Sequence, residues 1–564
     1  MCFSTTLLFL KNITTILLMT SSKIWLGVVM LAVTLILILT TLSDAPTYDE
    51  PAHIASGLTY AQLSDLRFNS EHPPLIKFLS GLSLRLFYSD FKLNITQQDL
   101  QNPHTHVIYD LGRNLFEQNN PTKLLLLSRL PLILLTLLGI FFVYQLTSDI
   151  LQDQEKGLIA SVLFGFEFNV LANGALVTTD MGLLVFWLGT VLFYLRFLFK
   201  GRWQNLLFSG LLFGLALLTK YSAVFILPIV FFASLSLAKT VSIKKILISL
   251  GVVALIGWVV IWLFYLPFEA PQMLWEELPI VQETIAVKKS ETVDALVAVA
   301  PLPYYYRYGL KLINHHEAVG QLQYLAGRVG QFNWRWFYPL SFLLKTAEMY
   351  LVMFMISIYL VIRQKISNQR LTFLLIMIGL YFLLTIYSGM AFGMRILLPV
   401  IGFGAVLTGA CTDKIKNTQL RQMLMIFYVL LSIIRFPYFF SSANFFSAVL
   451  GSKHEMMIDS NLDWGQDLKR LSSWCREREI DSLAVLANTS LPIEVWGVQS
   501  LSLDEAYEQR GYVAVSSTVL NLPIELETED GEIATLNKPF VFLDDYTVKE
   551  KLGSFVIYDL ARKK

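Results

Sequence analysis

Residues 44–77 have the sequence D-A-P-T-Y-D-E-P-A-H-I-A-S-G-L-T-Y-A-Q-L-S-D-L-R-F-N-S-E-H-P-P-L-I-K and follow directly on an apolar run long enough to cross a bilayer. Asp49 and Glu50 stand just beyond that run, and His53 lies one helical turn after Asp49. A second polar pair, E-H, precedes two prolines. Carboxylates and imidazoles are the side chains that most often move protons in enzymes. We therefore expect the rest of the chain to hold a substrate against this loop.

The composition is that of a membrane protein. Of the 564 residues, 55% are hydrophobic and only 15% are charged, and the mean hydropathy is +0.55. This is too apolar for a soluble protein of such length. The net charge of +1, without a basic run, gives no support to a nucleic-acid partner. Cys2, Cys411 and Cys475 are too far apart for a disulfide framework or a zinc motif.

The first 23 residues form an N-terminal extension with an apolar stretch of its own, Phe3–Thr20. A cleaved signal peptide is one interpretation, but the stretch lacks an A-x-A-like cleavage site. A start at Met19 is another, because it would leave a short tail that ends at Lys23. We expect the extension to be dispensable.

About eleven apolar segments are predicted to span the membrane. The first runs from about Ile24 to Leu42. The others lie near Leu124–Leu146, Gly157–Ala175, Met181–Phe199, Leu206–Leu218, Ala223–Leu237, Ile246–Pro267, Pro339–Ile362, Leu371–Tyr387, Ile396–Ala410 and Met423–Phe440. The predicted fold is therefore mainly α, with a transmembrane domain over residues 24–440.

Basic residues fall in alternate loops, which predicts the orientation of the chain. They are Lys200 and Arg202; Lys239, Lys244 and Lys245; Arg363, Lys365 and Arg370; and Lys414, Lys416 and Arg421. Loops rich in Lys and Arg stay in the cytoplasm. We therefore expect the N-terminus inside, and outer loops over residues 43–121 and 269–338. The first outer loop is expected to contain amphipathic helices.

The tail, residues 441–564, is more highly charged and has shorter apolar runs. The segment D-W-G-Q-D-L-K-R-L-S-S-W-C is typical of an amphipathic helix. The predicted strands are Leu483–Leu486, Tyr512–Ser516, Phe540–Phe542 and Phe555–Tyr558. We expect a small α+β domain on the outer face.

With this topology, the polar residues that interrupt apolar sequence gather on the outer face. Asp180 lies in V-T-T-D-M, Lys220 in L-L-T-K-Y-S and Arg395 in G-M-R-I-L-L-P, each at the outer end of a span. His315 and His316 lie in the second outer loop. Charges at membrane depth are costly and usually face a cavity or a substrate pathway. Their convergence on one face is stronger evidence for a site than any single residue.

Each of these residues also has an ordinary structural interpretation. Asp49 and Asp180 can cap the helices that follow them. His53, four residues after Asp49, can simply hydrogen-bond to it on one helix face. Lys220 and Arg395 can extend toward lipid headgroups.

The order of these motifs resembles the membrane-embedded C-type glycosyltransferases. Asp49-Glu50 follows the first span, then come E-H-P-P-L, T-T-D, L-L-T-K with Pro228 downstream, and R-I-L-L-P. The pattern looks closest to the protein O-mannosyltransferases and their bacterial relatives, including the aminoarabinose transferase that modifies lipid A. The resemblance runs from about Ile24 to about Leu471, and D-S-N-L-D-W-G-Q-D-L also looks like bacterial members.

This resemblance implies an inverting transfer of a sugar from a polyprenyl-phosphate carrier to a protein, lipid or glycan acceptor. The site would face outward from the plasma (inner) membrane. Asp49 matches the family's general base and Glu50 its acidic neighbour, and both are implied to be catalytic. Lys220 and Arg395 match cations that would hold the carrier phosphate. The other substrate-binding positions implied are His53, Glu71, His72 and Asp180.

One departure from the family concerns the second polar pair. In the aminoarabinose branch a lysine follows the glutamate, whereas here His72 follows Glu71. The glutamate position takes part in a metal site in that branch. The resemblance therefore implies, as a further hypothesis, a divalent metal ion held by Glu71 with His315 or His316.

The alternative function is a multi-span transporter or flippase. A transporter predicts charges near the membrane midplane and broken helices in corresponding halves. This chain has its charges at one end and shows no half-repeat. A structural subunit without catalysis would not need the intact Asp49-Glu50 pair. The sequence thus favours the glycosyltransferase.

Overall fold

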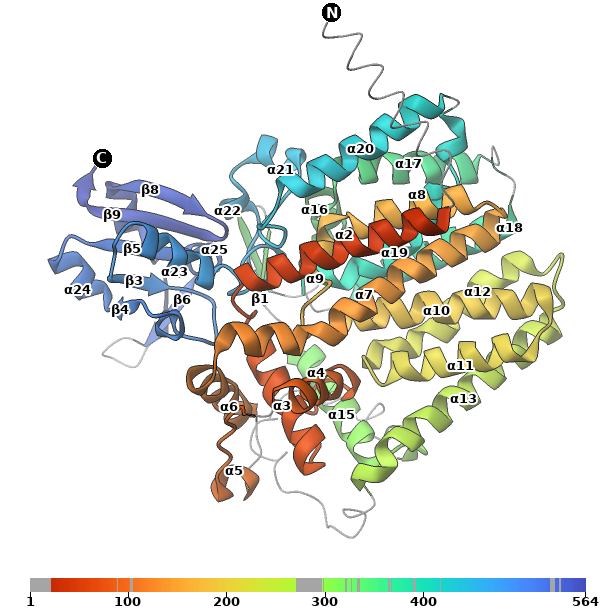
Figure 1. The fold of residues 1–564 in the computed structure, drawn as a ribbon, viewed down its shortest axis with the longest axis horizontal. Helices are drawn as coiled ribbons and strands as arrows, with labels where there is room; N and C mark the ends of the chain where they lie inside the picture. Colours follow the sequence, from red (N-terminus) through yellow and green to blue (C-terminus); the bar gives the residue numbers. More distant parts are fainter. Residues whose placement is uncertain are drawn as a thin grey trace, which may run out of the picture.

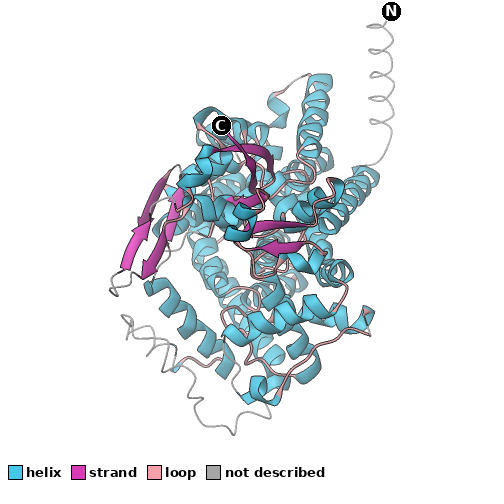
Figure 2. Ribbon diagram, turned by 90° about the vertical axis from the view of Figure 1, so that its left-hand side faces the viewer, coloured by secondary structure: helices cyan, strands magenta, loops and turns pink. Residues whose placement is uncertain are grey.

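The computed structural model describes residues 22–88, 90–101, 105–269, 297, 299–319, 322–325, 327–331, 335–363, 366, 368–388, 392–415, 417–527, 533–536 and 539–564. Nearly all of the predicted N-terminal extension and part of the second outer loop lie outside these residues. Figures 1 and 2 show long helices gathered in one body, with the strands at one end of it.

Helices make up most of the described chain, which confirms a mainly α fold. The α-helices of the first half are α2 (Ser22–Ser43), α3 (Glu50–Leu63), α4 (Leu75–Phe87), α5 (Gln97–Gln101), α6 (Thr105–Gln118), α7 (Pro121–Leu151), α8 (Gln154–Gly165), α9 (Phe168–Asn173), α10 (Thr179–Lys200), α11 (Trp203–Leu217), α12 (Ile226–Ser234) and α13 (Ile243–Glu269). Those that follow are α15 (Tyr304–Val319), α16 (Phe337–Lys345), α17 (Glu348–Ile362), α18 (Gln369–Tyr387), α19 (Leu398–Gly409), α20 (Thr418–Ile434), α21 (Phe445–Leu450), α22 (Lys453–Met456), α23 (Leu468–Glu477), α24 (Leu503–Glu508) and α25 (Ser517–Asn521). The short 3-10 helices are η1 (Tyr221–Phe225), η2 (Leu235–Leu237), η4 (Met394–Leu397), η5 (Thr412–Lys414), η6 (Asp459–Asn461), η7 (Ile493–Trp496) and η8 (Val541–Asp545).

Several helices are long and apolar enough to cross a membrane. They are α2, α7, α10, α13 and α18. Helices α16 and α17 meet the same criterion when they are taken together, and the bend between them is 120°. Shorter apolar segments are α11, Tyr221–Leu237, Met394–Gly409 and α20. Every predicted span except Gly157–Ala175 falls on one of these, so the polytopic membrane fold is confirmed.

The predicted span Gly157–Ala175 is instead two shorter helices, α8 and α9. The break falls at Glu167, whose buried carboxylate accepts a hydrogen bond from the Asn169 amide at 2.6 Å and so caps α9. The same carboxylate accepts the Ala347 amide at 3.1 Å, at the bend between α16 and α17. The Glu167 carboxylate therefore caps α9 and also fixes the bend between α16 and α17.

The first outer loop folds into short helices, as predicted, and glycines set their spacing. A Cβ atom at Gly57 of α3 would lie 1.9 Å from the Lys77 carbonyl oxygen of α4. A Cβ atom at Gly81 of α4 would lie 2.0 Å from the Gly57 oxygen. The two helices thus pack backbone against backbone. This close contact holds the start of α3 in a fixed position.

The tail contains the predicted α+β fold. Its strands are β3 (Ser482–Leu486), β4 (Gln499–Leu501), β5 (Tyr512–Ser516), β6 (Ile524–Glu527), β7 (Ile533–Leu536), β8 (Tyr546–Leu552) and β9 (Phe555–Lys563), whereas β1 (Leu322–Leu325) and β2 (Arg328–Gln331) belong to the second outer loop. Five of them form one sheet in the order β4-β3-β5-β9-β8, in which β3 is parallel to β4 and β5, and β9 is antiparallel to its neighbours. β1 pairs with β2 and β6 with β7 as separate hairpins.

Two predictions within the tail need correction. Phe540–Phe542 is not a strand, since most of it lies in η8. Leu543 is the buried residue there, whereas Val541 and Phe542 are exposed, so the run does not alternate as a strand in a sheet does. The amphipathic helix α23 begins at Leu468, after the D-W-G-Q segment rather than within it.

The tail and the first outer loop are joined by backbone hydrogen bonds. The Ala45 amide donates to the Gln466 carbonyl at 2.9 Å, and the Tyr48 amide donates to the Trp464 carbonyl at 2.8 Å. The D-W-G-Q segment therefore lies against the residues that lead into α3. This places the tail at the same end of the helical body as the first outer loop (Figure 1).

Candidate active site

Four charged side chains predicted from the sequence lie together, and we call them the site cluster: Asp49, Asp180, Lys220 and Arg395. Asp180 is in the first turn of α10, Lys220 precedes η1 and Arg395 lies in η4. Lys220 Nζ is 2.5 Å from Asp180 Oδ1. Arg395 Nη1 is 3.8 Å from Asp180 Oδ2 and 3.9 Å from Asp49 Oδ2. Segments that are far apart in the sequence thus supply one constellation of two acids and two cations.

The geometry argues against the ordinary interpretations of these residues. The side chains of Lys220 and Arg395 are only 15% and 11% exposed and face carboxylates rather than extending outward. Asp49 occupies the N-cap position of α3, yet its side chain makes no capping hydrogen bond. Within the described part of the chain, the His53 ring hydrogen-bonds to the Val177 carbonyl and not to Asp49.

Asp49 is the most accessible acid of the site cluster. Its side chain is 28% exposed. The Tyr109 hydroxyl, from α6, donates to Asp49 Oδ1 at 3.3 Å. Both this hydrogen bond and the contact to Arg395 are long for charge-assisted contacts. Asp49 therefore has room to accept a proton from a molecule that enters the site.

Glu50 has the opposite environment, although it is the next residue. Its side chain is fully buried. Arg129 donates through Nε at 2.9 Å and through Nη2 at 2.6 Å, and the amides of Thr47 and Val177 donate at 2.8 and 2.9 Å. Burial alone would raise the pKa of Glu50, but Arg129 and these hydrogen bonds hold it below its usual value. Its oxygens are saturated by the protein, which fits an anchor better than a proton acceptor.

Glu50 is part of a larger set of buried charges, which we call the anchor network: Asp44, Glu50, Arg129, Asp467 and Arg470. Arg129 Nη1 lies 3.2 Å from Asp44 Oδ2. Arg470 pairs with both Asp44 and Asp467. The network ties the first outer loop to α7 and to α23. Sequence reasoning missed Arg129, although a lone arginine inside an apolar run was a usable signal.

The two histidines of the first outer loop lie near each other. The His53 ring donates from Nδ1 to the Val177 carbonyl at 2.7 Å, and its centroid is 6.1 Å from that of His72. Burial, and then the charge of Lys220, lower the pKa of His72 well below its usual value, so this ring is neutral at neutral pH. His72 Nδ1 is buried and has no hydrogen-bond partner among the described residues, which leaves it available to a bound molecule.

Lys77 follows the second polar pair and holds its loop in place. Its buried ammonium donates to the carbonyls of Asn69 and His72, the latter at 2.9 Å. Burial lowers the pKa of Lys77 to about 7, although the negative charge of half-buried Glu71 acts to raise it. Lys77 was not among the predicted site residues, and its role here is to shape the loop.

Arg395 is held in place by the D-S-N-L-D-W segment of the tail. Its guanidinium lies 4.1 Å from the centre of the Trp464 ring. The side-chain oxygen of Asn461 accepts the Met394 amide at 2.8 Å, one residue before Arg395. Gly393, with φ +74°, supplies the left-handed turn into η4. The motif noted in the sequence thus positions a cation of the site cluster.

The predicted metal site stays a prediction. His315 and His316 lie on α15, but their side chains are outside the described residues. Among the side chains that the structure describes, no group of three or more His, Cys, Asp or Glu is arranged to hold a metal ion.

Residues 123–264 match the family model described as dolichyl-phosphate-mannose-protein mannosyltransferase. The match covers about a quarter of the chain and includes Asp180 and Lys220 of the site cluster and Arg129 of the anchor network. It confirms the resemblance to the membrane-embedded C-type glycosyltransferases that the motifs indicate. No curated protein sequence matches the chain.

Solved structures are similar to the chain at low identity. ArnT from Cupriavidus metallidurans bound to undecaprenyl phosphate is 11% identical, with 95% of this chain and 98% of that chain covered and a TM-score of 0.49. AglB from Archaeoglobus fulgidus, in complex with an inhibitory peptide and a dolichol-phosphate, is 12% identical over 92% and 75%, with a TM-score of 0.43. The Pmt1-Pmt2 complex of S. cerevisiae bound to the sugar donor is 17% identical over 45% and 34%, with a TM-score of 0.33. At these values the likeness assigns no role to any residue.

Proposed function

We propose that the chain is an inverting glycosyltransferase that moves one sugar from a polyprenyl-phosphate carrier to a protein, lipid or glycan acceptor. The observation that carries the proposal is the site cluster, where the partly exposed carboxylate of Asp49 lies beside Arg395, and buried Asp180 contacts both Arg395 and Lys220. The family match supports it, because the description names a lipid-phosphate sugar as the donor.

The two cations suit a phosphate leaving group. As the bond between the sugar and the carrier phosphate breaks, the phosphate takes the bonding electron pair and gains negative charge. Lys220 and Arg395 would stabilise that charge more in the transition state than in the ground state. Asp180 contacts both cations, so it would hold their side chains in position before the donor arrives.

Asp49 is the proposed general base. The acceptor hydroxyl or amine attacks the anomeric carbon from the side opposite the phosphate, so the configuration inverts. Asp49 takes the proton that the acceptor loses as the new bond forms. The long contacts of Asp49 to Tyr109 and Arg395 leave an oxygen able to receive it.

The remaining residues of the first outer loop receive supporting roles. We revise the catalytic role implied for Glu50 to that of an anchor, because the protein saturates its oxygens. The unpartnered Nδ1 of His72 is proposed to hydrogen-bond the donor. His53 fixes the loop through Val177 and lines the same end of the site.

The site and the tail are proposed to face outward from the plasma membrane. The alternating basic loops support this orientation. Cysteines introduced at Lys244 and Ser502 test it, because Cys411 and Cys475 are buried and Cys2 can be replaced by serine. An impermeant thiol reagent added outside should label only the Ser502 site. Labelling of both sites, or of Lys244 alone, would contradict the orientation.

The reaction is tested with purified full-length protein in liposomes that contain radiolabelled polyprenyl-phosphate sugars. We expect the donor to be consumed, with free polyprenyl phosphate released and the label found on an acceptor. A comparison of the glycoproteins and glycolipids of cells with and without the protein identifies that acceptor. A lipid-linked sugar that crosses the membrane chemically unchanged would support a flippase and overturn the proposal.

A further inference from the structure

The end of the helical body opposite the site cluster carries a second group of charges. Asp180 and Lys200 stand near the two ends of α10, a helix of 22 residues. At 1.5 Å per residue they are about 30 Å apart, which is about the thickness of the hydrocarbon core of a bilayer. Lys200 therefore stands at the other membrane surface, independently of the proposed function.

A cavity of about 250 Å³ lies at that surface, between the C-terminal ends of α7 and α10 and the start of α18. Its polar rim holds Asp149, Arg196, Lys200 and Arg370. Its deeper wall is made of buried aliphatic side chains, among them Leu192. The cavity is smaller than the roughly 300–1,000 Å³ that enclose a whole ligand, so it suits a headgroup rather than an entire molecule.

The rim has more positive than negative charge. Arg196 pairs with Asp149, and Lys200 Nζ lies 3.4 Å from the same carboxylate. Arg370 has no carboxylate partner within the described part of the chain. It donates through Nη1 to the Asp149 carbonyl at 2.9 Å, and its guanidinium lies 4.1 Å from the centre of the Phe199 ring. One carboxylate thus faces three cations, and two positive charges remain unneutralised.

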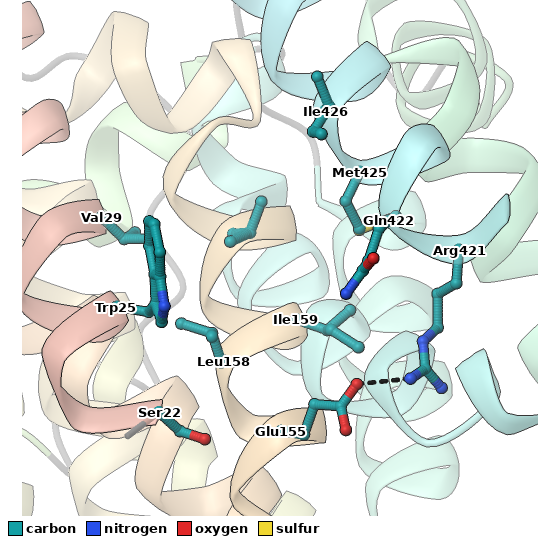
Figure 3. A pocket seen from close by; sticks show the side chains of 11 residues that line it. Ser22, Trp25, Val29, Glu155, Leu158, Ile159, Arg421, Gln422, Met425 and Ile426 are labelled. Carbon is teal, nitrogen blue, oxygen red and sulfur yellow. Dashed lines mark hydrogen bonds and ion pairs between the residues drawn. The ribbon is translucent and has the colours of Figure 1, made fainter. Parts of the chain in front are cut away.

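A second cavity at the same membrane surface provides a contrast. It has a volume of about 270 Å³ and lies between α2, α8 and α20 (Figure 3). Its cation, Arg421, pairs with Glu155 at 2.5 Å, as the dashed line in Figure 3 shows. The charges there balance one to one. A basic residue at this end of the molecule can therefore be paired with a carboxylate. Of the two cavities, the first is the one with excess positive charge.

We propose that the cavity between α7, α10 and α18 binds the phosphate headgroup of an anionic membrane lipid. Arg370 and Arg196 present planar guanidinium groups, which suit phosphate oxygens. Phe199 holds the Arg370 side chain in position through its ring. The buried aliphatic wall gives apolar contact to the part of the lipid next to its headgroup. Basic pockets between membrane helices recognise anionic lipid headgroups by this combination of charge and apolar contact.

The test is a titration of the detergent-purified full chain with phosphatidylglycerol, phosphatidylcholine or inorganic phosphate, with bound molecules counted by native mass spectrometry. Each rim cation that contacts the headgroup phosphate is expected to contribute on the order of fivefold in affinity. Lys200→Gln combined with Arg370→Gln should therefore weaken phosphatidylglycerol binding roughly 25-fold. The matched control, Lys239→Gln with Arg421→Gln, removes two charges from the same end outside this cavity and should change binding by less than about threefold.

A further variant separates a lipid site from a structural ion pair. Asp149→Asn removes the only carboxylate among the described residues of the rim, so it should strengthen phosphatidylglycerol binding severalfold while phosphatidylcholine binding stays unchanged. Unchanged or weaker phosphatidylglycerol binding in Asp149→Asn would overturn the proposal, as would equal losses in the two double variants. Displacement of phosphatidylglycerol by millimolar inorganic phosphate would assign the cavity to a free anion and overturn the lipid assignment.

Discussion

The anchor network and Asp49 of the site cluster differ in how completely the protein satisfies their charges. In the anchor network, Arg129 and its carboxylate partners are buried at 0–8% side-chain exposure. In the site cluster, Asp49 is 28% exposed and its contacts are longer than 3 Å. The two sets meet at adjacent residues, Asp49 and Glu50. The difference teaches that a saturated charge fixes the fold, whereas an incompletely satisfied one can act on a substrate.

The largest expected effect comes from breaking the anchor network. Arg129→Met leaves buried Glu50 without its cation and leaves Asp44 with Arg470 alone, and removal of one partner of a buried ion pair costs about 3–5 kcal/mol. We expect a large drop in thermal stability of the purified protein. Asp49→Asn is the matched control and should melt close to wild type. A melting temperature of Arg129→Met within a few degrees of wild type would mean that the network does not anchor the loop.

The next effect concerns the carrier phosphate. Lys220→Ala removes a cation whose contact with a phosphate would contribute about 1.5–3 kcal/mol, so donor affinity should fall about 10- to 100-fold. Expression should be retained, and any loss of thermal stability should be smaller than in Arg129→Met, because Asp180 keeps its contact with Arg395 at 3.8 Å. Lys220→Arg keeps the charge and should retain most of the affinity. Equal binding of a polyprenyl-phosphate by Lys220→Ala and wild type would show that Lys220 is only an interface residue.

A smaller effect is expected at the edge of the site cluster. Tyr109→Phe removes the hydroxyl that donates to Asp49 at 3.3 Å and leaves the ring in place. A single hydrogen bond of this kind contributes about 1 kcal/mol, so turnover should fall only about fivefold. Steady-state kinetics with the true acceptor measure this fall in turnover. A loss as large as that from Asp49→Asn would give Tyr109 itself a catalytic role.

The sequence predicted the site cluster because its members are lone charges at the ends of apolar runs. Asp180, Lys220 and Arg395 each interrupt such a run, and the structure brings them together. The sequence could not separate Asp49 from Glu50, because neighbours share the same local sequence. Their difference comes from Arg129, 79 positions after Glu50 in the chain.

The parts of the fold that were not predicted depend on long-range contacts. Glu167 lies in a run that is otherwise apolar enough for a span, and its carboxylate both caps α9 through the Asn169 amide and accepts the distant Ala347 amide. Phe540–Phe542 has strand-forming residues, but a local 3-10 turn buries Leu543 instead. Hydropathy reports how apolar a segment is, and it does not report which distant group a single polar atom contacts.

The most direct measurement of the central claim compares Asp49→Asn with wild type in turnover of a polyprenyl-phosphate sugar with the true acceptor. Asparagine keeps the shape of the side chain but removes the basic oxygen. The variant should fold, insert and bind the carrier as wild type does, and should lose turnover by a factor on the order of 100 or more. Turnover within a few-fold of wild type in a well-folded sample would contradict the account and move the base elsewhere, with Glu50 the first residue to test.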